Sequence, residues 1–393
     1  MRPDRVFVLF NLLSGLGMGF IAPNYAPFVL GVGLTMPQIA LINAVFFLTI
    51  VVMELPTGML ADGRSRAWSI WIGSAFAAVF HLAYSLVSGF WGALFCEVMA
   101  GISMSFISGA LDAWVTDALG GAGDGKQLRK VLASGAVTSS IGCLAGGVAG
   151  AFCGVYDLRL GFWIGGGFQL AAFVVARLFM DRRGEPLQRT GELVALKDSL
   201  TALWSSRSLA WAAMAAASSG LVCSFNHYWS PFFIGRFGRI DRLSLVWVVI
   251  YGGSTLGSWA IRRWARCHGR ESLAVVASLG LTGLGLAFTA LLPGLFWPLM
   301  FAFGHEFGRG AFRPLISTFV QRRVGSSFRA TYGSLQSFIE RFGFATVLSL
   351  VWLLTRHLPD GEPLIALTWT VQGSLLTLIA GLLWLFRPRR QSD

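Results

Sequence analysis

Acidic side chains inside long apolar stretches are the residues of this chain best suited to chemistry. Asp112 and Glu306 both lie in such stretches. Burial there disfavours the ionised form of a carboxyl group, which allows the group to take up and release a proton. We therefore expect a proton-coupling carboxyl group at Asp112 or Glu306.

The two acids differ in their neighbours. Asp112 has no basic residue three or four positions away, whereas Arg309 follows Glu306 by three positions. Side chains at this spacing share one helix face and can neutralise each other. A structural ion pair therefore explains Glu306 as well as a functional role does, and Asp112 is the preferred coupling residue.

The elements that carry these acids are predicted to be membrane-spanning helices. Apolar residues make up 55% of the 393-residue chain and charged residues 13%. Twelve spans of about 20–25 residues with short loops would use nearly the whole length. Apolar runs broken by turn or charge signals predict helices at residues 6–29, 36–61, 67–88, 91–118, 128–153, 159–181, 207–234, 242–266, 271–292, 295–320, 327–356 and 363–387.

Lysine and arginine predict the orientation of these helices. Most of the 31 basic residues lie at the two termini and in the loops after even-numbered helices. Basic loops stay in the cytoplasm, so both termini are predicted to be cytoplasmic. The loops on the other side hold Arg159, Arg236, Arg239, Arg242 and Arg356. The net charge of +12 is spread over loops and does not form one stripe, so we expect no nucleic-acid partner.

A short loop motif follows the second predicted helix. Gly58, Asp62, Arg64 and Arg66 form a glycine, an acid four residues later and then two basic residues. This motif resembles the loop signature of the major facilitator superfamily between helices two and three, with departures at Gly63 and Ser65. A short cytoplasmic loop that merely carries one acid and two arginines is the alternative interpretation.

The fourth predicted helix extends the resemblance. Asp117 lies at its cytoplasmic end, where the family has an acid that joins a charge relay with the loop aspartate and a loop arginine. The resemblance therefore implies a gating relay of Asp62, Arg64, Arg66 and Asp117. An acid that only ends a helix in water is the alternative, although it would oppose the helix dipole.

A glycine-rich stretch in the fifth predicted helix bears on transport direction. Residues 142–151 resemble the glycine motif of antiporters in this superfamily. Small residues four positions apart also allow ordinary close helix packing, which is the more common reason for them. Export of the substrate is therefore one expectation and uptake another.

The resemblance also implies an architecture and a site. We expect an all-α membrane protein with the major facilitator fold, in which residues 1–180 and 208–393 form two six-helix halves joined by a cytoplasmic linker at 181–207. In the family, helices one, four, seven and ten line a central cavity. On this basis the predicted substrate-cavity residues are Ser105, Ser108, Asn226, His227, Trp229, His305 and Arg309.

The expected function is secondary active transport of a small organic molecule by alternating access, with proton-coupled export preferred over proton- or ion-coupled uptake. A non-transporting membrane receptor or a lipid-handling protein of the same fold is a further alternative. We expect no cofactor, no metal site and no enzymatic activity, because the sequence shows no constellation of nucleophile, base or metal ligands. The expected partners are the substrate, protons and the lipid bilayer of a cell membrane, of bacterial inner-membrane type, with the protein acting as a monomer.

Overall fold

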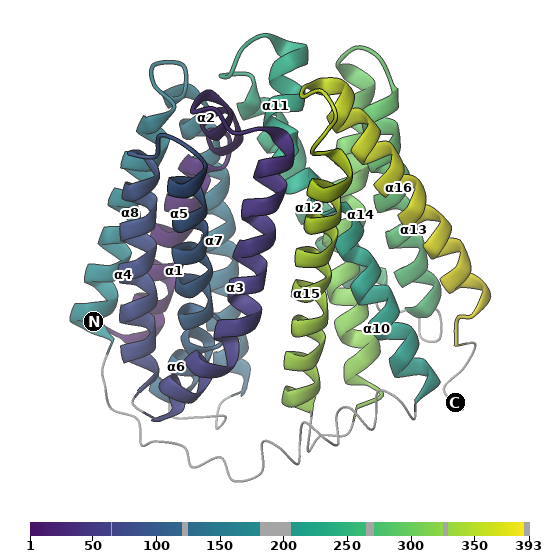
Figure 1. The fold of residues 1–393 in the computed structure, drawn as a ribbon. Helices are drawn as coiled ribbons and strands as arrows, with labels where there is room; N and C mark the ends of the chain where they lie inside the picture. Colours follow the sequence, from purple (N-terminus) through teal and green to yellow (C-terminus); the bar gives the residue numbers. More distant parts are fainter. Residues whose placement is uncertain (64, 120–124, 181–205, 265–270, 325–328, 389–393) are drawn as a thin grey trace. The chain divides into compact units, whose positions relative to one another are not determined.

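The computed structural model describes residues 1–63, 65–119, 125–180, 206–264, 271–324 and 329–388, and over these ranges it contains helices and no strands (Figure 1). In the described part of the chain, eleven helical segments are long and apolar enough to span a membrane. The 26-residue helix α14 (Phe296–Gln321) is also long enough but carries Glu306, Arg309 and Arg313. The all-α membrane fold is therefore confirmed, and α14 occupies the place of the remaining predicted span.

The chain falls into two compact units. Unit 1 comprises Met1–Gln188 and Phe237–Trp247, and unit 2 comprises Arg189–Arg236 and Val248–Asp393. The predicted halves at 1–180 and 208–393 stay predictions, and most of the predicted linker lies outside the described residues.

The helices of unit 1 are α1 (Pro3–Ile21), α2 (Tyr25–Gly31), α3 (Met36–Gly63), α4 (Arg66–Tyr84), α5 (Phe90–Ile107), α6 (Ala110–Ala118), α7 (Gly125–Cys153) and α8 (Arg159–Phe179). Those that lie wholly or mainly in unit 2 are α10 (Arg207–Ser219), the short 3-10 helix η2 (Gly220–Val222), α11 (Phe225–Phe237), α12 (Leu243–Trp264), α13 (Glu271–Leu291), α14, α15 (Arg329–Thr355) and α16 (Glu362–Leu385). Within unit 1, α1 packs against α7 and α8, and α5 packs between α3 and α4. Within unit 2, α13 packs against α14 and α16.

Three predicted helices are interrupted. The break between α1 and α2 follows from Pro23, which has no N–H to continue the helix ladder. The amide of Asn24 compensates for this, because its Nδ2 donates to the carbonyl oxygens of Phe20 and Gly150, each at 2.9 Å. A second break separates α5 from α6 at Gly109, whose φ of 78° suits glycine. The third separates α10 from α11 through η2.

Close backbone contact between α1 and α7 explains much of the glycine-rich stretch. A Cβ added at Gly146 would lie 2.5 Å from the carbonyl oxygen of Leu16, and one at Gly150 would lie 2.5 Å from that of Phe20. On the facing helix, a Cβ at Gly19 would lie 2.4 Å from the carbonyl oxygen of Cys143. Helix packing therefore accounts for these glycines directly.

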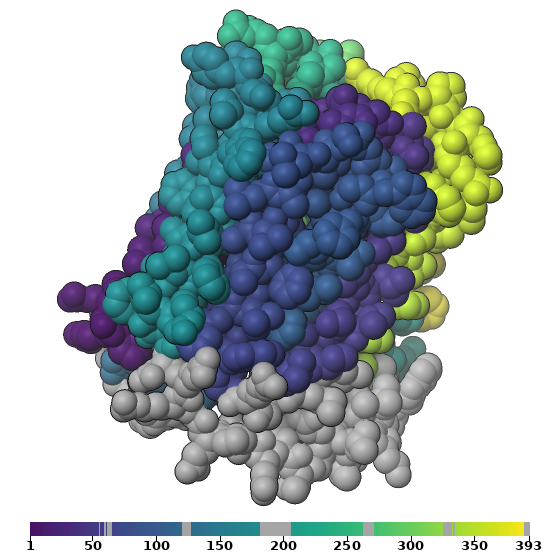
Figure 2. Space-filling view, turned by 60° about the vertical axis from the view of Figure 1, so that its left-hand side comes forward, coloured from purple at the N-terminus to yellow at the C-terminus, as the bar shows by residue number. Residues whose placement is uncertain are grey.

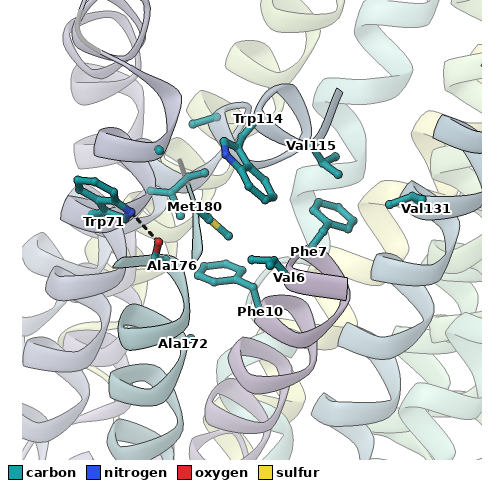
Figure 3. Packing of buried hydrophobic residues seen from close by; sticks show 13 residues of the cluster. Val6, Phe7, Phe10, Trp71, Trp114, Val115, Val131, Ala172, Ala176 and Met180 are labelled. Carbon is teal, nitrogen blue, oxygen red and sulfur yellow. Dashed lines mark hydrogen bonds between the residues drawn. The ribbon is translucent and has the colours of Figure 1, made fainter. Parts of the chain in front are cut away.

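A buried apolar cluster holds α6 in place (Figure 3). Trp114 and Val115 of α6 join Val6, Phe7 and Phe10 of α1 in this cluster. It extends to α4 and α8, where Nε1 of Trp71 donates to the carbonyl oxygen of Ala176 at 2.8 Å. The short helix that carries Asp112 and Asp117 is thereby fixed against three longer helices.

Three helices of unit 1, α4, α5 and α8, carry exposed apolar side chains. Figure 2 shows these helices, with α4 and α5 in blue and α8 in teal. Large apolar side chains of these helices are exposed, among them Val79, Trp91, Phe95, Leu170 and Leu178. Apolar side chains in contact with lipid tails are expected on a membrane-spanning helix bundle.

Candidate functional site

A charged cluster joins α11 and α14 inside unit 2. Nη1 of Arg309 lies 2.6 Å from Oε1 of Glu306 and donates to Oδ1 of Asn226 at 2.8 Å. Glu306 is 6% exposed, whereas the side chain of Arg309 is 29% exposed and Asn226 is exposed. The Glu306–Arg309 ion pair inferred from their spacing is present. The arrangement leaves part of the Arg309 side chain accessible within unit 2.

His305 supports this cluster from the buried side. Its ring is fully buried, packs 4.5 Å from the ring of Phe225, and places Nδ1 2.9 Å from the carbonyl oxygen of Thr282. A carbonyl only accepts, so Nδ1 carries the hydrogen in this contact. The other nitrogen, Nε2, lies 3.8 Å from Oε1 of Glu306. His305 therefore ties α13 to the part of α14 that holds Glu306.

The other predicted cavity residues of unit 2 lie on α11. His227 is half-buried, and Trp229 is 3% exposed. Their neighbour Asn226 accepts a hydrogen bond from Nη1 of Arg309 through its Oδ1. The near-complete burial of Trp229 is typical of a packing residue.

The two predicted cavity serines lie in unit 1. Ser105 is 4% exposed, and its hydroxyl donates to the carbonyl oxygen of Gly101 at 2.9 Å. Its own carbonyl accepts from Oγ1 of Thr57 at 3.1 Å, so Ser105 links α5 to α3. Ser108 is half-buried and ends α5 at the break before α6.

Asp112 lies in the first turn of α6 and is exposed. Negative charge is favourable at that end of a helix. The backbone carbonyl oxygen of Asp112 accepts a hydrogen bond from the hydroxyl of Thr116 at 2.7 Å. Within the described residues, no basic side chain forms an ion pair with Asp112.

The predicted relay is described in part. Nη1 of Arg66, at the start of α4, forms an ion pair with Asp117 near the end of α6 and also donates to the carbonyl oxygen of Ala113 at 2.9 Å. Asp62 lies in the last turn of α3, but its side chain is outside the described residues, as is all of Arg64. Arg66 compensates for an acid at a helix C-terminus.

A second pair occupies the corresponding place in unit 2 with the charges exchanged. Glu271, at the start of α13, forms an ion pair with Arg322, and its Oε2 lies 3.6 Å from Nη1 of Arg323. The partners of each pair, Arg66 with Asp117 and Glu271 with Arg322, are 51 residues apart. The sequence interpretation missed this pair, although the repeated spacing was a usable signal.

The two pairs differ in their relation to the helix dipoles. Arg66 begins a helix and Asp117 is near the end of one, and both positions are unfavourable for their charges. Glu271 begins a helix and Arg322 follows the end of one, and both are favourable. In unit 1 each charge therefore depends on its partner to offset the dipole of its own helix, whereas in unit 2 each charge is also favoured by its own helix.

We predict that Asp117→Asn leaves the protein folded and slows transport. The Asp117 side chain is 44% exposed, so its loss has little effect on stability. A lost contact that favours one gating state shifts the conformational equilibrium by about 1–3 kcal/mol. The effect on transport is measured in vesicles at equal protein levels. The variants compared are Asp117→Asn, Asp62→Asn and the charge-exchanged Arg66→Asp/Asp117→Arg. Transport rates equal to wild type in both single variants would exclude a role of the relay in gating.

The sequence of this chain matches a family model and two uncharacterized proteins of the same family type. The family model of the Major Facilitator Superfamily matches residues 7–348. An uncharacterized MFS-type transporter, YxaM of Bacillus subtilis, is 22% identical over 360 residues, which cover 86% of each chain. A second, MJ1560 of Methanocaldococcus jannaschii, is 25% identical over 179 residues, or 45% of this chain and 46% of that protein.

Solved structures with the same fold include the nucleoside transporter NupG, with a TM-score of 0.80, 12% identity and coverage of 99% of this chain and 100% of that one. The POT family transporter PepTSo has a TM-score of 0.75, 12% identity and coverage of 100% and 99%. At these identities the likeness shows the fold alone. The match over residues 7–348, together with the helical architecture, shows that this chain belongs to the Major Facilitator Superfamily and is a multi-pass membrane protein of the transporter type.

Proposed function

We propose that this protein exports a small, partly apolar organic molecule by alternating access, driven by protons. The observation that carries the proposal is the cluster of Asn226, Glu306 and Arg309, which leaves a polar surface accessible on membrane-spanning helices. Charged groups at membrane depth are costly and generally mark a substrate or ion pathway. Apolar side chains around such a cluster would suit a substrate that is mostly apolar.

Coupling to protons is assigned to Asp112 in preference to Glu306. Arg309 neutralises Glu306 at 2.6 Å, which favours a permanently charged pair. Asp112 is exposed and has no ion-pair partner within the described residues, so water can reach its carboxyl group and no cation competes with a proton for it.

We predict that Asp112→Asn abolishes transport driven by a pH gradient and retains exchange of substrate at equal pH. Asparagine keeps the size of the side chain but binds no proton. A screen of drug tolerance in cells lacking their own exporters supplies the substrate, and reconstituted vesicles then provide both measurements. Asp157→Asn, an exposed acid between α7 and α8, is the control. Proton-driven accumulation by Asp112→Asn would exclude Asp112 as the coupling residue.

Proton-coupled uptake is the second candidate. Its support is the contact between α1 and α7, because the glycines of the antiporter-like stretch face a neighbouring backbone and need no export function. The direction of pH-gradient-driven movement in the same vesicles separates the two candidates.

We also infer that both termini lie in the cytoplasm of a cell-membrane protein. Two of the arginines that oppose the charge bias are paired. Nε of Arg236 lies 2.8 Å from Oε1 of Glu362, and Arg239 forms an ion pair with Asp241 at 2.8 Å. The hydrogen bond from Arg239 lowers the pKa of Asp241, so that carboxyl group remains ionised. A tag between Pro231 and Arg242 is expected to report the outside, and a cytoplasmic readout there would contradict the orientation.

A further inference from the structure

Glu97 of α5 lies in a buried polar cluster of unit 1 that no predicted site residue shares. The side chain is 5% exposed. The hydroxyl groups of Tyr25 and Tyr84 both donate to its Oε1 at 2.6 Å. Nδ2 of Asn43 in turn donates to the hydroxyl of Tyr25 at 2.7 Å, which directs the Tyr25 hydrogen toward Glu97. Three elements, α2, α3 and α4, thus supply groups around one carboxyl group.

No cation balances this carboxyl group within the described residues. None of the ion pairs of the described chain includes Glu97. The titratable side chains that face it are Tyr25 from α2 and Tyr84 from α4, with Cys96 beside it on α5. His81, one turn before Tyr84, places its Nδ1 2.6 Å from the carbonyl oxygen of Ala77. An unpaired charge at membrane depth costs at least about 2.5–3.5 kcal/mol, whereas the neutral acid costs far less.

One residue of the cluster is partly exposed. Tyr25 is half-buried, whereas Tyr84 is 2% exposed. Glu97 follows the first residue of α5 by seven positions, so it lies about 10 Å along that helix. Asp112 lies beyond the break at the other end of the same predicted span. Unit 1 therefore has one acid toward each end of this span.

From this geometry we infer that Glu97 is a second proton-binding site, loaded and emptied through Tyr25 at the end of unit 1 opposite Asp112. To load the site, the Tyr25 hydroxyl passes its proton to Oε1 of Glu97 as the phenol oxygen takes a proton from water, and the reverse steps empty the site. In each step one O–H bond breaks as another forms, and water at that end supplies and receives the proton. When Glu97 is ionised, the two phenol hydroxyls stabilise the charge. The position of α2 then depends on the protonation of Glu97, because Tyr25 is the first residue of that helix.

The inference rests on the proposed proton coupling, but its first test does not need transport. Infrared spectra of the purified full-length protein in detergent are recorded across a pH series. Wild type is expected to show the C=O band of a protonated carboxylic acid that disappears as pH rises, and Glu97→Gln is expected to lack it. Tyr25→Phe and Tyr84→Phe are expected to shift the band, because each removes a hydrogen bond to the same oxygen. Asp157→Asn is expected to keep the wild-type band.

Two results would overturn the inference. One is a Glu97→Gln spectrum identical to wild type, and the other is a band assigned to Glu97 that does not change with pH, as for a permanently neutral structural acid. In vesicles, Glu97→Gln is expected to lose pH-gradient-driven transport and keep exchange at equal pH. If a pH gradient does not drive transport by the wild-type protein, the proposed proton coupling is refuted. If the titrating band is still present in that case, proton binding at Glu97 remains established.

Discussion

Gly19→Ala is expected to destabilise unit 1, although alanine is normally the better helix residue. In an exposed helix this change is worth up to about 1 kcal/mol in favour of alanine. Here the added Cβ would lie 2.4 Å from the carbonyl oxygen of Cys143. Ordinary contact requires the α1 and α7 backbones to move apart by about 1 Å, which costs about 1–3 kcal/mol or more.

Gly167→Ala in α8 is the matched control, because nothing lies within 4 Å of the Cβ it would add. It is expected to leave stability unchanged or to raise it slightly. The midpoint of thermal unfolding in detergent measures both variants. Equal midpoints for the two would show that α1 and α7 do not approach as closely as described.

Arg309→Met is expected to cause the second large loss, and Glu306→Gln in addition is expected to restore most of it. Removing the arginine leaves the carboxyl group of Glu306 buried without its cation, and breaking a buried pair costs about 3–5 kcal/mol. Replacing both partners leaves no charge uncompensated. Asn226→Ala, which removes only a hydrogen bond at an exposed residue, is expected to cost about 1 kcal/mol.

A double-mutant cycle in unfolding free energy tests the pair. The Glu306→Gln/Arg309→Met variant should be more stable than Arg309→Met alone. If the losses of the two single variants simply add, the residues do not interact, and the ion pair would have no part in holding the cluster. Transport is expected to fall in the two variants that lack Arg309, because Arg309 is part of the proposed substrate site.

Hydropathy predicted the helices closely because each span must bury a long apolar segment in lipid. The predicted ranges 36–61 and 159–181 correspond to α3, Met36–Gly63, and α8, Arg159–Phe179. The interruptions were missed, since apolar residues continue through them and the local causes are single residues such as Pro23 and Gly109. Single residues determine where these helices break, whereas hydropathy averaged over a window shows only that the whole segment is apolar.

Some contacts of the candidate sites could likewise be predicted from the sequence, and others could not. Glu306 and Arg309 are three residues apart, so their contact follows from helix geometry. Tyr25 and Glu97 are 72 residues apart, and their contact depends on how α2 and α5 pack. Pairing over such a distance leaves no periodic signal, and the cluster around Glu97 became visible only in the structure.

The exchanged charges of the two ion pairs also affect how the chain assembles. Two units that each hold an ion pair of this kind could in principle dock a helix of one unit against a partner helix of the other. Here α4 against α14 would bring Arg66 to Arg322, and α13 against α6 would bring Glu271 to Asp117. Like charges about 4 Å apart repel by about 1–4 kcal/mol between water and a protein surface. The charges of the two pairs therefore disfavour the exchange of these partner helices between the two units.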